Sequence, residues 1–286
     1  MKVIADSGSS KTLWRVYANQ RLSAEIKTQG LNPGGMELRD FEERMTGFDY
    51  WSDSIQEVYF YGAGCVGQGK VFMEEALAKK FPKAQITVEN DLLGAARSLY
   101  GNEPGYVGIL GTGSNACFYD GENLIRRRGG HGYLLSDEGG GYYLGRQLLA
   151  DYMNGQIPED LRELLERAFG LNPQNLVAKV YGAFQPNRYV AGFSLFVKDN
   201  IGHPYLQRLV AYGFRDYFKT TFANKSFYAG DYPVRFIGSV AVAYEDILRE
   251  VAVDFDIVVK TINRDPMSGL ELYHNCVNLE TKHEHD

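Results

Sequence analysis

Two short segments of the sequence combine glycine with hydroxyl side chains, and each follows an apolar stretch. Residues 6–12 read Asp-Ser-Gly-Ser-Ser-Lys-Thr, and residues 111–115 read Gly-Thr-Gly-Ser-Asn. Turns of this composition let backbone N–H groups and hydroxyls converge on phosphate oxygens. The residues predicted to bind phosphate are Gly8, Ser9, Ser10, Lys11, Thr12, Gly111, Thr112, Gly113 and Ser114.

The first segment ends in Lys-Thr, as a P-loop does, but the rest of that motif is missing. A P-loop needs glycine directly before the lysine and again five residues earlier, and these positions hold Ser10 and Ala5. It also opens a helix, whereas residues 13–17 alternate like a strand. An ordinary hairpin turn is the alternative for each segment alone. Two such turns at matching places predict a polyphosphate held from both walls of a cleft.

Two aspartates lie at the ends of predicted strands. Asp6 follows the strand expected over residues 2–5 and could orient Mg²⁺ through water, because Mg²⁺ prefers oxygen ligands and retains several waters. Asp91 follows the strand expected over residues 85–89 and precedes a helix. A carboxylate there can accept the proton of an alcohol during phosphoryl transfer. The alternative for Asp91 is a helix cap.

Two further segments contain glycine where a strand or loop meets a helix. Gly238 and Ser239 join the strand expected over residues 234–237 to a helix over 240–251, and adenosine could lie against such small residues. Tight packing of that helix on the strand is the alternative. Residues 129–141 contain six glycines and imply a shaped loop, after which Asp137 and Glu138 are expected to open a helix. These two acids either complement the helix dipole or accept bonds from substrate hydroxyls.

The elements that must position these residues repeat along the chain. In each half a strand leads into a small-residue turn and a hairpin, and Ile4–Ser10 aligns with Ile109–Asn115. Repetition at domain length favours a duplicated domain over a solenoid. The breaker cluster at residues 101–105 predicts the boundary. We expect lobes at 1–103 and 104–265, with a closing helix over 266–280 that completes the first.

The composition excludes several functional classes. The chain has 286 residues, about two domains, with 44% hydrophobic residues and a net charge of −6. This balance disfavours nucleic acid and anionic membranes as partners. Asp6 interrupts any N-terminal signal segment, and no apolar run reaches the roughly 18 residues of a membrane span. The widely spaced Cys65, Cys117 and Cys276 indicate a reducing, cytoplasmic location, and the tyrosine-rich composition is compatible with a homodimer.

Together these motifs resemble the sugar kinase/Hsp70/actin ATP-binding superfamily, and most closely its N-acetylglucosamine kinase-like branch, grouped with the BadF/BadG-type ATPases. Residues 6–12 and 111–115 resemble the two phosphate motifs, and residues 238–241 resemble the adenosine motif. Asn90-Asp91 with Ala95-Ala96 resembles the junction that carries the catalytic aspartate. The stretch 130–139 resembles the sugar-binding loop, and Asn32 falls where the family places a sugar-contacting loop.

The resemblance implies an α/β fold of two similar actin-like, ribonuclease H-like lobes with a cleft between them. It implies ATP and Mg²⁺ as cofactors and transfer of the γ-phosphoryl group to a hydroxyl of N-acetylglucosamine or glucosamine. The implied sugar contacts are Asn32, Asn115, Gly132, Asp137 and Glu138. His131 stands where vertebrate amino-sugar kinases carry tryptophan, which leaves the N-acetyl requirement open.

Two other functions remain open at this point. The first is an activator ATPase of a 2-hydroxyacyl-CoA dehydratase or benzoyl-CoA reductase system, which shares the phosphate motifs but carries paired cysteines for an iron–sulfur cluster. No two of the three cysteines are close in this sequence, although one cysteine from each of two chains could bridge a dimer. The second is a nucleotide-binding module without catalytic activity.

Overall fold

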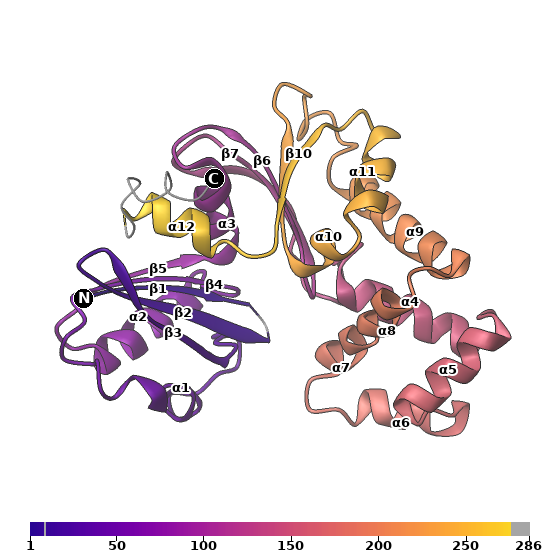
Figure 1. Cartoon of the computed structure of the whole chain (residues 1–286), viewed down its shortest axis with the longest axis horizontal. Helices are drawn as coiled ribbons and strands as arrows, with labels where there is room; N and C mark the ends of the chain where they lie inside the picture. Colours follow the sequence, from indigo (N-terminus) through magenta and orange to yellow (C-terminus); the bar gives the residue numbers. More distant parts are fainter. Residues whose placement is uncertain (9, 276–286) are drawn as a thin grey trace, which may run out of the picture. The chain divides into compact units, whose positions relative to one another are not determined.

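The computed structural model describes residues 1–8 and 10–275. They form two compact units, each built on a five-stranded sheet of its own (Figure 1). The first unit comprises Met1–Glu103, Asp120–Asn123 and the C-terminal segment that begins at Asp265, and the second comprises Pro104–Tyr119 and Leu124–Arg264.

The sheet of the first unit has the strand order β3-β2-β1-β4-β5. Its strands are β1 (Lys2–Ser7), β2 (Lys11–Ala18), β3 (Arg21–Gln29), β4 (Glu57–Gly62) and β5 (Gln85–Asn90). The pairs β1–β2 and β2–β3 are antiparallel, whereas β1–β4 and β4–β5 are parallel. Side chains alternate across a strand, so Val3 and Ala5 enter one hydrophobic core and Ile4 enters the other.

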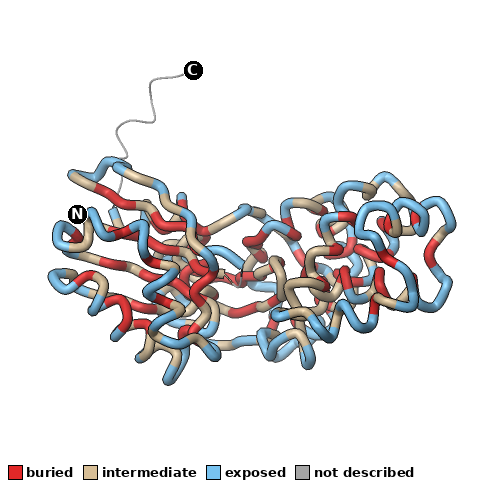
Figure 2. The backbone as a smooth tube through the Cα atoms, turned by 90° about the horizontal axis from the view of Figure 1, so that it is seen from below, coloured by how far each residue is buried: buried red, intermediate tan, exposed pale blue. Residues whose placement is uncertain are grey.

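Helices cover both faces of this sheet. One face packs on α1 (Leu38–Arg44) and α2 (Gln68–Lys80), and the other on α3 (Asp91–Tyr100) and α12 (Met267–Tyr273). A short 3₁₀ helix (Thr46–Phe48) completes the first core by placing the Phe48 ring 4.9 Å from the ring of Trp14. Figure 2 shows the buried stretches of the backbone in red.

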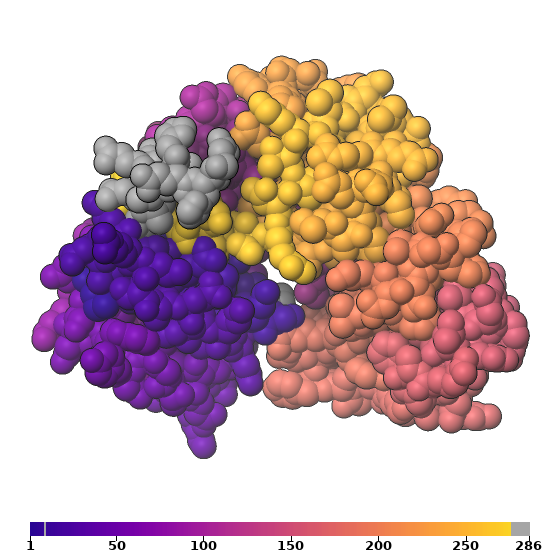
Figure 3. Space-filling view, viewed as in Figure 1, coloured from indigo at the N-terminus to yellow at the C-terminus, as the bar shows by residue number. Residues whose placement is uncertain are grey.

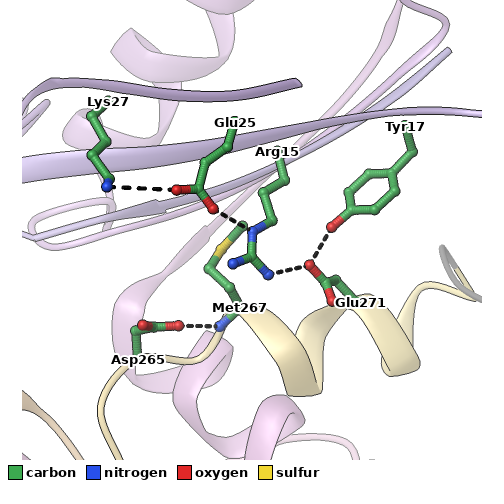
Figure 4. Close-up of polar contacts among 7 residues, drawn as sticks. All are labelled: Arg15, Tyr17, Glu25, Lys27, Asp265, Met267 and Glu271. Carbon is green, nitrogen blue, oxygen red and sulfur yellow. Dashed lines mark hydrogen bonds and ion pairs between the residues drawn. The ribbon is translucent and has the colours of Figure 1, made fainter. Parts of the chain in front are cut away.

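The C-terminal helix α12 belongs to the first unit although it follows the whole second unit in the sequence. In Figure 3 it lies, in yellow, against the indigo N-terminal strands. The guanidinium of Arg15 donates to the Glu271 carboxylate, which also accepts from the hydroxyl of Tyr17 (Figure 4). Asp265 accepts from the backbone N–H of Met267 at 3.1 Å and so fixes the start of the helix.

The residue after α12 is held against the same sheet. The imidazole of His274 stacks on the ring of Tyr59 with centroids 3.8 Å apart, and its Nε2 is 2.8 Å from the hydroxyl of Tyr61. Burial, followed by the charges of Arg97 and Lys2, lowers the pKa of His274 to about 4. Protonation of this imidazole therefore opposes the docked position of the C-terminal segment.

We expect this histidine to make the first unit less stable in acid. The free energy of unfolding should rise with pH from about 4 to about 6.5 and stay level above it, because the unfolded chain binds the proton more tightly. Urea unfolding at about pH 4.5 and about pH 7.5 should differ by roughly 2–3 kcal/mol more in the wild type than in His274→Phe. If the free energy of unfolding changed equally between the two pH values in His274→Phe and in the wild type, the acid sensitivity could not be assigned to His274.

The second unit repeats the strand arrangement of the first. Its sheet has the order β10-β9-β6-β7-β8. The strands are β6 (Gly105–Leu110), β7 (Ser114–Tyr119), β8 (Leu124–Gly129), β9 (Val234–Ile237) and β10 (Val259–Asn263). The first three are antiparallel in sequence order, and β9 and β10 add in parallel, as β4 and β5 do in the first unit. The α/β fold of two similar lobes is thus confirmed.

The turns of the two sheets are not identical. The closing pair is Ser7–Thr12 in the first sheet and Leu110–Ser114 in the second. One more residue lies between the paired positions in the first turn than in the second. The two motifs are therefore related by topology and cannot be superposed residue for residue.

The second unit carries an all-helical region between β8 and β9. Its helices are α4 (Gly141–Met153), α5 (Glu159–Phe169), α6 (Pro173–Tyr181), α7 (Pro186–Gly192), α8 (Ser194–Asp199) and α9 (Pro204–Thr220). After β9, the helix expected over residues 240–251 is divided at Tyr244 into α10 (Ser239–Ala243) and α11 (Glu245–Val253). Within the described residues, no helix combines the length and apolar character needed to cross a bilayer.

Candidate functional site

Three parallel strands of the first unit end at the same edge of their sheet. The register aligns Ser7 of β1 with Gly62 of β4, and Gly62 with Asn90 of β5. Asp6 stands one residue before this edge, and Asp91 stands one residue beyond it. The carboxyl ends of parallel strands are where α/β sheets bind ligands. The fold therefore brings together two acids that lie far apart in the sequence.

Asp6 lies in an environment that opposes its negative charge. Burial, followed by the charges of Asp91 and Asp265, raises the pKa of Asp6 to about 7, while Lys11 acts in the opposite direction. A carboxylate held beside two other acids attracts a cation, because a positive charge would relieve the repulsion among them. The chemistry of these oxygen donors fits the predicted Mg²⁺, which would be oriented by Asp6.

Asp265 also acts on Asp6, although the sequence does not predict it as a site residue. It precedes α12 and comes to this edge through the return of the chain from the second unit. Its local signal, an Asp-Pro pair before a helix, indicates only the start of that helix. Nothing in the sequence near Asp6 points to it.

Asp91 is the first residue of α3 and does not cap it. The cap is Asn90, whose side-chain oxygen accepts from the backbone N–H of Leu93 at 2.8 Å. The N-cap position that the alternative gave to Asp91 therefore belongs to Asn90. Its Oδ1 accepts from the N–H of Leu92 at 3.0 Å, which orients the carboxylate at the helix N-terminus. An acid held in this way can accept a proton from a bound alcohol.

Two buried hydroxyls connect the first turn to the loop that carries Asn32. Ser7 Oγ lies 2.8 Å from Thr12 Oγ1, and the N–H of Leu31 donates to these oxygens at 3.0 and 3.2 Å. Thr12, expected to bind phosphate, therefore has its hydroxyl in the interior, where it fixes the loop. The side chain of Asn32 accepts from the N–H of Gly34 at 3.0 Å.

The remaining residues of the first turn lie nearer the surface. Ser10 and Lys11 are exposed, and Gly8 donates its N–H to the carbonyl of Lys11 at 3.0 Å. Ser9 lies outside the described residues. Among the described residues of the turn, the hydroxyl of Ser10 and the ammonium group of Lys11 are thus exposed, and the charge of Lys11 acts on the carboxylate of Asp6.

The second turn, residues 111–113, directs two backbone N–H groups outward. Its carbonyls at Gly111 and Thr112 accept from the N–H groups of Gly141 and Tyr142 at 2.8 and 2.9 Å, in the first turn of α4. The C=O and N–H of a trans peptide point in opposite directions. The N–H groups of Thr112 and Gly113 therefore point away from α4, and they donate no hydrogen bond within the described chain. Adjacent free N–H groups of this kind suit a phosphate oxygen.

The residues around the second turn are placed as follows. Ser114 is buried, and its N–H donates to Asp137 Oδ1 at 3.0 Å. Asn115 lies opposite Gly129 in the antiparallel pair of β7 and β8, and its side-chain Oδ1 accepts from the N–H of Ala116 at 2.9 Å. The segment 129–141 thus lies beside the turn, within one unit.

The expected helix at Asp137 and Glu138 is wrong. Helix α4 begins at Gly141 after the cap residue Gly140, and Asp137 has a positive φ of 76°. The three glycines 139–141 allow the chain to enter α4 without regular structure. The N–H groups at the start of α4 then donate to the carbonyls of Gly111 and Thr112 in the segment 111–113. Glu138 is half-buried. Gly132 is exposed, and its carbonyl accepts from the N–H of Ser136 at 2.9 Å, which closes a tight turn.

Gly238 joins β9 to α10 where no side chain fits. It has a φ of 135°, and a Cβ there would collide with the carbonyl of Leu110. The packing explanation for this glycine therefore holds within the second unit. Ser239 is exposed at the start of α10, and a nucleoside contact at this position stays a prediction. Among the described residues, no group of three His, Cys, Asp or Glu side chains forms a ready-made metal site.

This chain is similar in sequence and fold to proteins of known structure. No family model matches the sequence, and no curated protein does. A solved structure from Porphyromonas gingivalis, provisionally assigned as an N-acetylglucosamine kinase, is 35% identical with a TM-score of 0.90, over 96% of this chain and 98% of that one.

Two more distant structures share the fold. A Chromobacterium violaceum protein with the same provisional assignment is 20% identical at a TM-score of 0.74, over 95% of this chain and 98% of its own. A ROK family glucokinase from Streptomyces griseus, solved with glucose and AMPPNP, is 15% identical at a TM-score of 0.55, over 96% of this chain and 98% of its own.

Proposed function

Because the chain belongs to the N-acetylglucosamine kinase-like family of the sugar kinase/Hsp70/actin superfamily, we propose that it is an ATP-dependent sugar kinase. The observation that carries this proposal is that Asp6 and Asp91 lie at one strand edge, where the charge of Asp91 raises the pKa of Asp6. The second unit adds two N–H groups, those of Thr112 and Gly113, which have no partner among the described residues. Phosphoryl transfer needs an acceptor for the alcohol proton and donors for the phosphoryl oxygens.

We assign a role to each part of the site. Asp91 accepts the proton of the sugar hydroxyl that attacks the γ-phosphorus. The N–H groups of Thr112 and Gly113 hold phosphate oxygens, as do Ser10 and Lys11 on the first turn. Asp6 orients Mg²⁺, which when bound neutralises charge on the phosphates.

The proposed substrate is an amino sugar, N-acetylglucosamine or glucosamine, phosphorylated on its primary hydroxyl. The 35% identity to a protein provisionally assigned as an N-acetylglucosamine kinase supports this class. Asn32, Asn115 and Glu138 offer side-chain oxygens or amides for sugar hydroxyls. His131 is exposed and stands where the vertebrate amino-sugar kinases carry tryptophan, so the sugars tested include amino sugars with and without the N-acetyl group.

A coupled assay of ADP release across a sugar panel tests the substrate. The panel contains glucosamine, N-acetylglucosamine, N-acetylmannosamine and glucose, each with ATP and Mg²⁺. We expect release to be stimulated most by N-acetylglucosamine or glucosamine. Stimulation by glucose alone would refute the proposed amino-sugar substrate but would still support sugar kinase activity.

The same preparation separates the other two functions. An activator ATPase purified without oxygen would be brown and contain iron and sulfide. Cys65 and Cys117 are buried, and Cys276 lies outside the described residues. A colourless protein excludes this function. Tight ATP binding without turnover on any sugar would favour a non-catalytic module.

A further inference from the structure

We propose that Asp137 is a positioning residue that fixes the second turn for phosphate, so that the glycine-rich segment 129–141 and the turn 111–115 act as one piece. This inference rests on the proposed function and deepens it. The resemblance implies that Asp137 contacts the sugar. Within the second unit its Oδ1 accepts from the backbone N–H of Ser114 at 3.0 Å, which gives this residue a role in the turn besides any contact of its other oxygen with the sugar.

The hydrogen bond that Asp137 accepts from Ser114 adds to the backbone hydrogen bonds that fix the conformation of the second turn. The first turn of α4 holds the carbonyls of Gly111 and Thr112, and the carbonyl of Gly113 accepts from the N–H of Gly111 at 2.9 Å. With the N–H of Ser114 held by Asp137, only two N–H groups of residues 111–114 stay without a partner in the described structure, those of Thr112 and Gly113. A donor pair fixed before binding needs little reorganisation when phosphate arrives.

The backbone of Asp137 is held in an unfavourable conformation. Its φ of 76° lies in the left-handed region, which residues with a side chain seldom adopt. Burial raises the pKa of this carboxyl, while the bond from Ser114 opposes the rise. Strain and burial of this kind persist where the surrounding structure requires them, and here the requirement is the bond to the turn.

Gly113 shows how closely the carboxylate sits against the turn. A Cβ at Gly113 would lie 2.5 Å from Asp137 Oδ1 and 2.7 Å from Oδ2. The φ of Gly113 is not in the positive range, so alanine would fit the backbone there. Gly113→Ala therefore introduces a collision with one side chain, that of Asp137.

Hydrogen exchange in the nucleotide-free protein tests the positioning directly. We expect the Ser114 amide to exchange at least tenfold faster in Asp137→Ala than in wild type, and Asp137→Asn to restore most of the protection because its Oδ1 still accepts. The matched control is Asp120→Ala. Asp120 accepts from Glu122 and Asn123 N–H groups at the other end of the hairpin, and its loss should not affect Ser114.

Binding and kinetics separate this role from sugar contact. For Asp137→Ala we expect the Kd of a non-hydrolysable ATP analogue, measured without sugar, to rise at least tenfold. A rise confined to the sugar KM, with Ser114 exchange unchanged, would overturn the proposal and make Asp137 a sugar contact.

A double variant gives the third measurement and covers the case in which Asp137→Ala folds poorly. Gly113→Ala alone should weaken binding of the analogue at least tenfold. In the Asp137→Ala background the same change should cost less than threefold, because the colliding carboxylate is gone. Additive effects would contradict the geometry. If the wild type binds ATP but phosphorylates no sugar, the proposed function fails, whereas the exchange and binding results still decide the role of Asp137.

Discussion

Asp91→Asn should lower kcat for sugar phosphorylation by about 10²–10⁴ while leaving the Kd for ATP within about twofold of wild type. The amide cannot accept the hydroxyl proton, yet it can still accept from the N–H of Leu92, as the Oδ1 of Asp91 does at 3.0 Å. The orientation at the start of α3 is therefore retained while the base is removed. Steady-state kinetics and calorimetry of analogue binding give the two numbers.

The control for this variant is an aspartate with no proposed part in the reaction. Asp120→Asn changes an exposed carboxylate in the hairpin turn between β7 and β8. It should match the wild type in kcat and in ATP affinity. If Asp91→Asn kept a tenth of the wild-type rate, the base would have to be another group.

Asp6→Asn should reduce activity and stabilise the metal-free protein. The rate should fall roughly 10–100-fold, because the group that orients Mg²⁺ through water is weakened. Stability should rise because the charge of Asp6 is opposed by burial and by Asp91 and Asp265, which raise its pKa to about 7. Removing that charge ends the repulsion.

The stabilisation depends on pH in a defined direction. A raised carboxyl pKa means that the folded state binds the proton more tightly, so stability falls as pH rises from about 4 to about 7. The gain in Asp6→Asn should reach at most roughly 4 kcal/mol at about pH 8 and shrink to under half of that at about pH 5. Urea unfolding in the presence of EDTA measures it. A variant less stable than wild type at the higher pH would refute the electrostatic account.

The sheets and most helices of this chain could be predicted because their signals are local. Residues 3–5 and 106–110 are continuous runs without a charged residue, and Asp120-Gly121 marks the hairpin between β7 and β8. The duplication was visible because both halves place a small-residue turn after such a run. Residues 185–200 mix glycine, proline and aromatic residues without a clear period, so the sequence predicts no helix where α7 and α8 lie.

Contacts between distant segments could not be predicted from local patterns. Asp265 reaches the edge that carries Asp6 only because the chain returns to the first unit after a complete second unit. Asp137 and Glu138 have the composition of a helix start, but Asp137 lies in the left-handed region and accepts from the N–H of Ser114, three residues before Gly140 caps α4. Tertiary contacts overrode the local preference in this case.

Phosphorus NMR of the protein incubated with ATP, Mg²⁺ and N-acetylglucosamine or glucosamine tests the central claim most directly. The account predicts that the γ-phosphate resonance of ATP declines as a sugar phosphomonoester resonance grows, in equal amounts, and that neither change occurs with Asp91→Asn. Growth of inorganic phosphate alone, at a rate indifferent to the sugar, would contradict it.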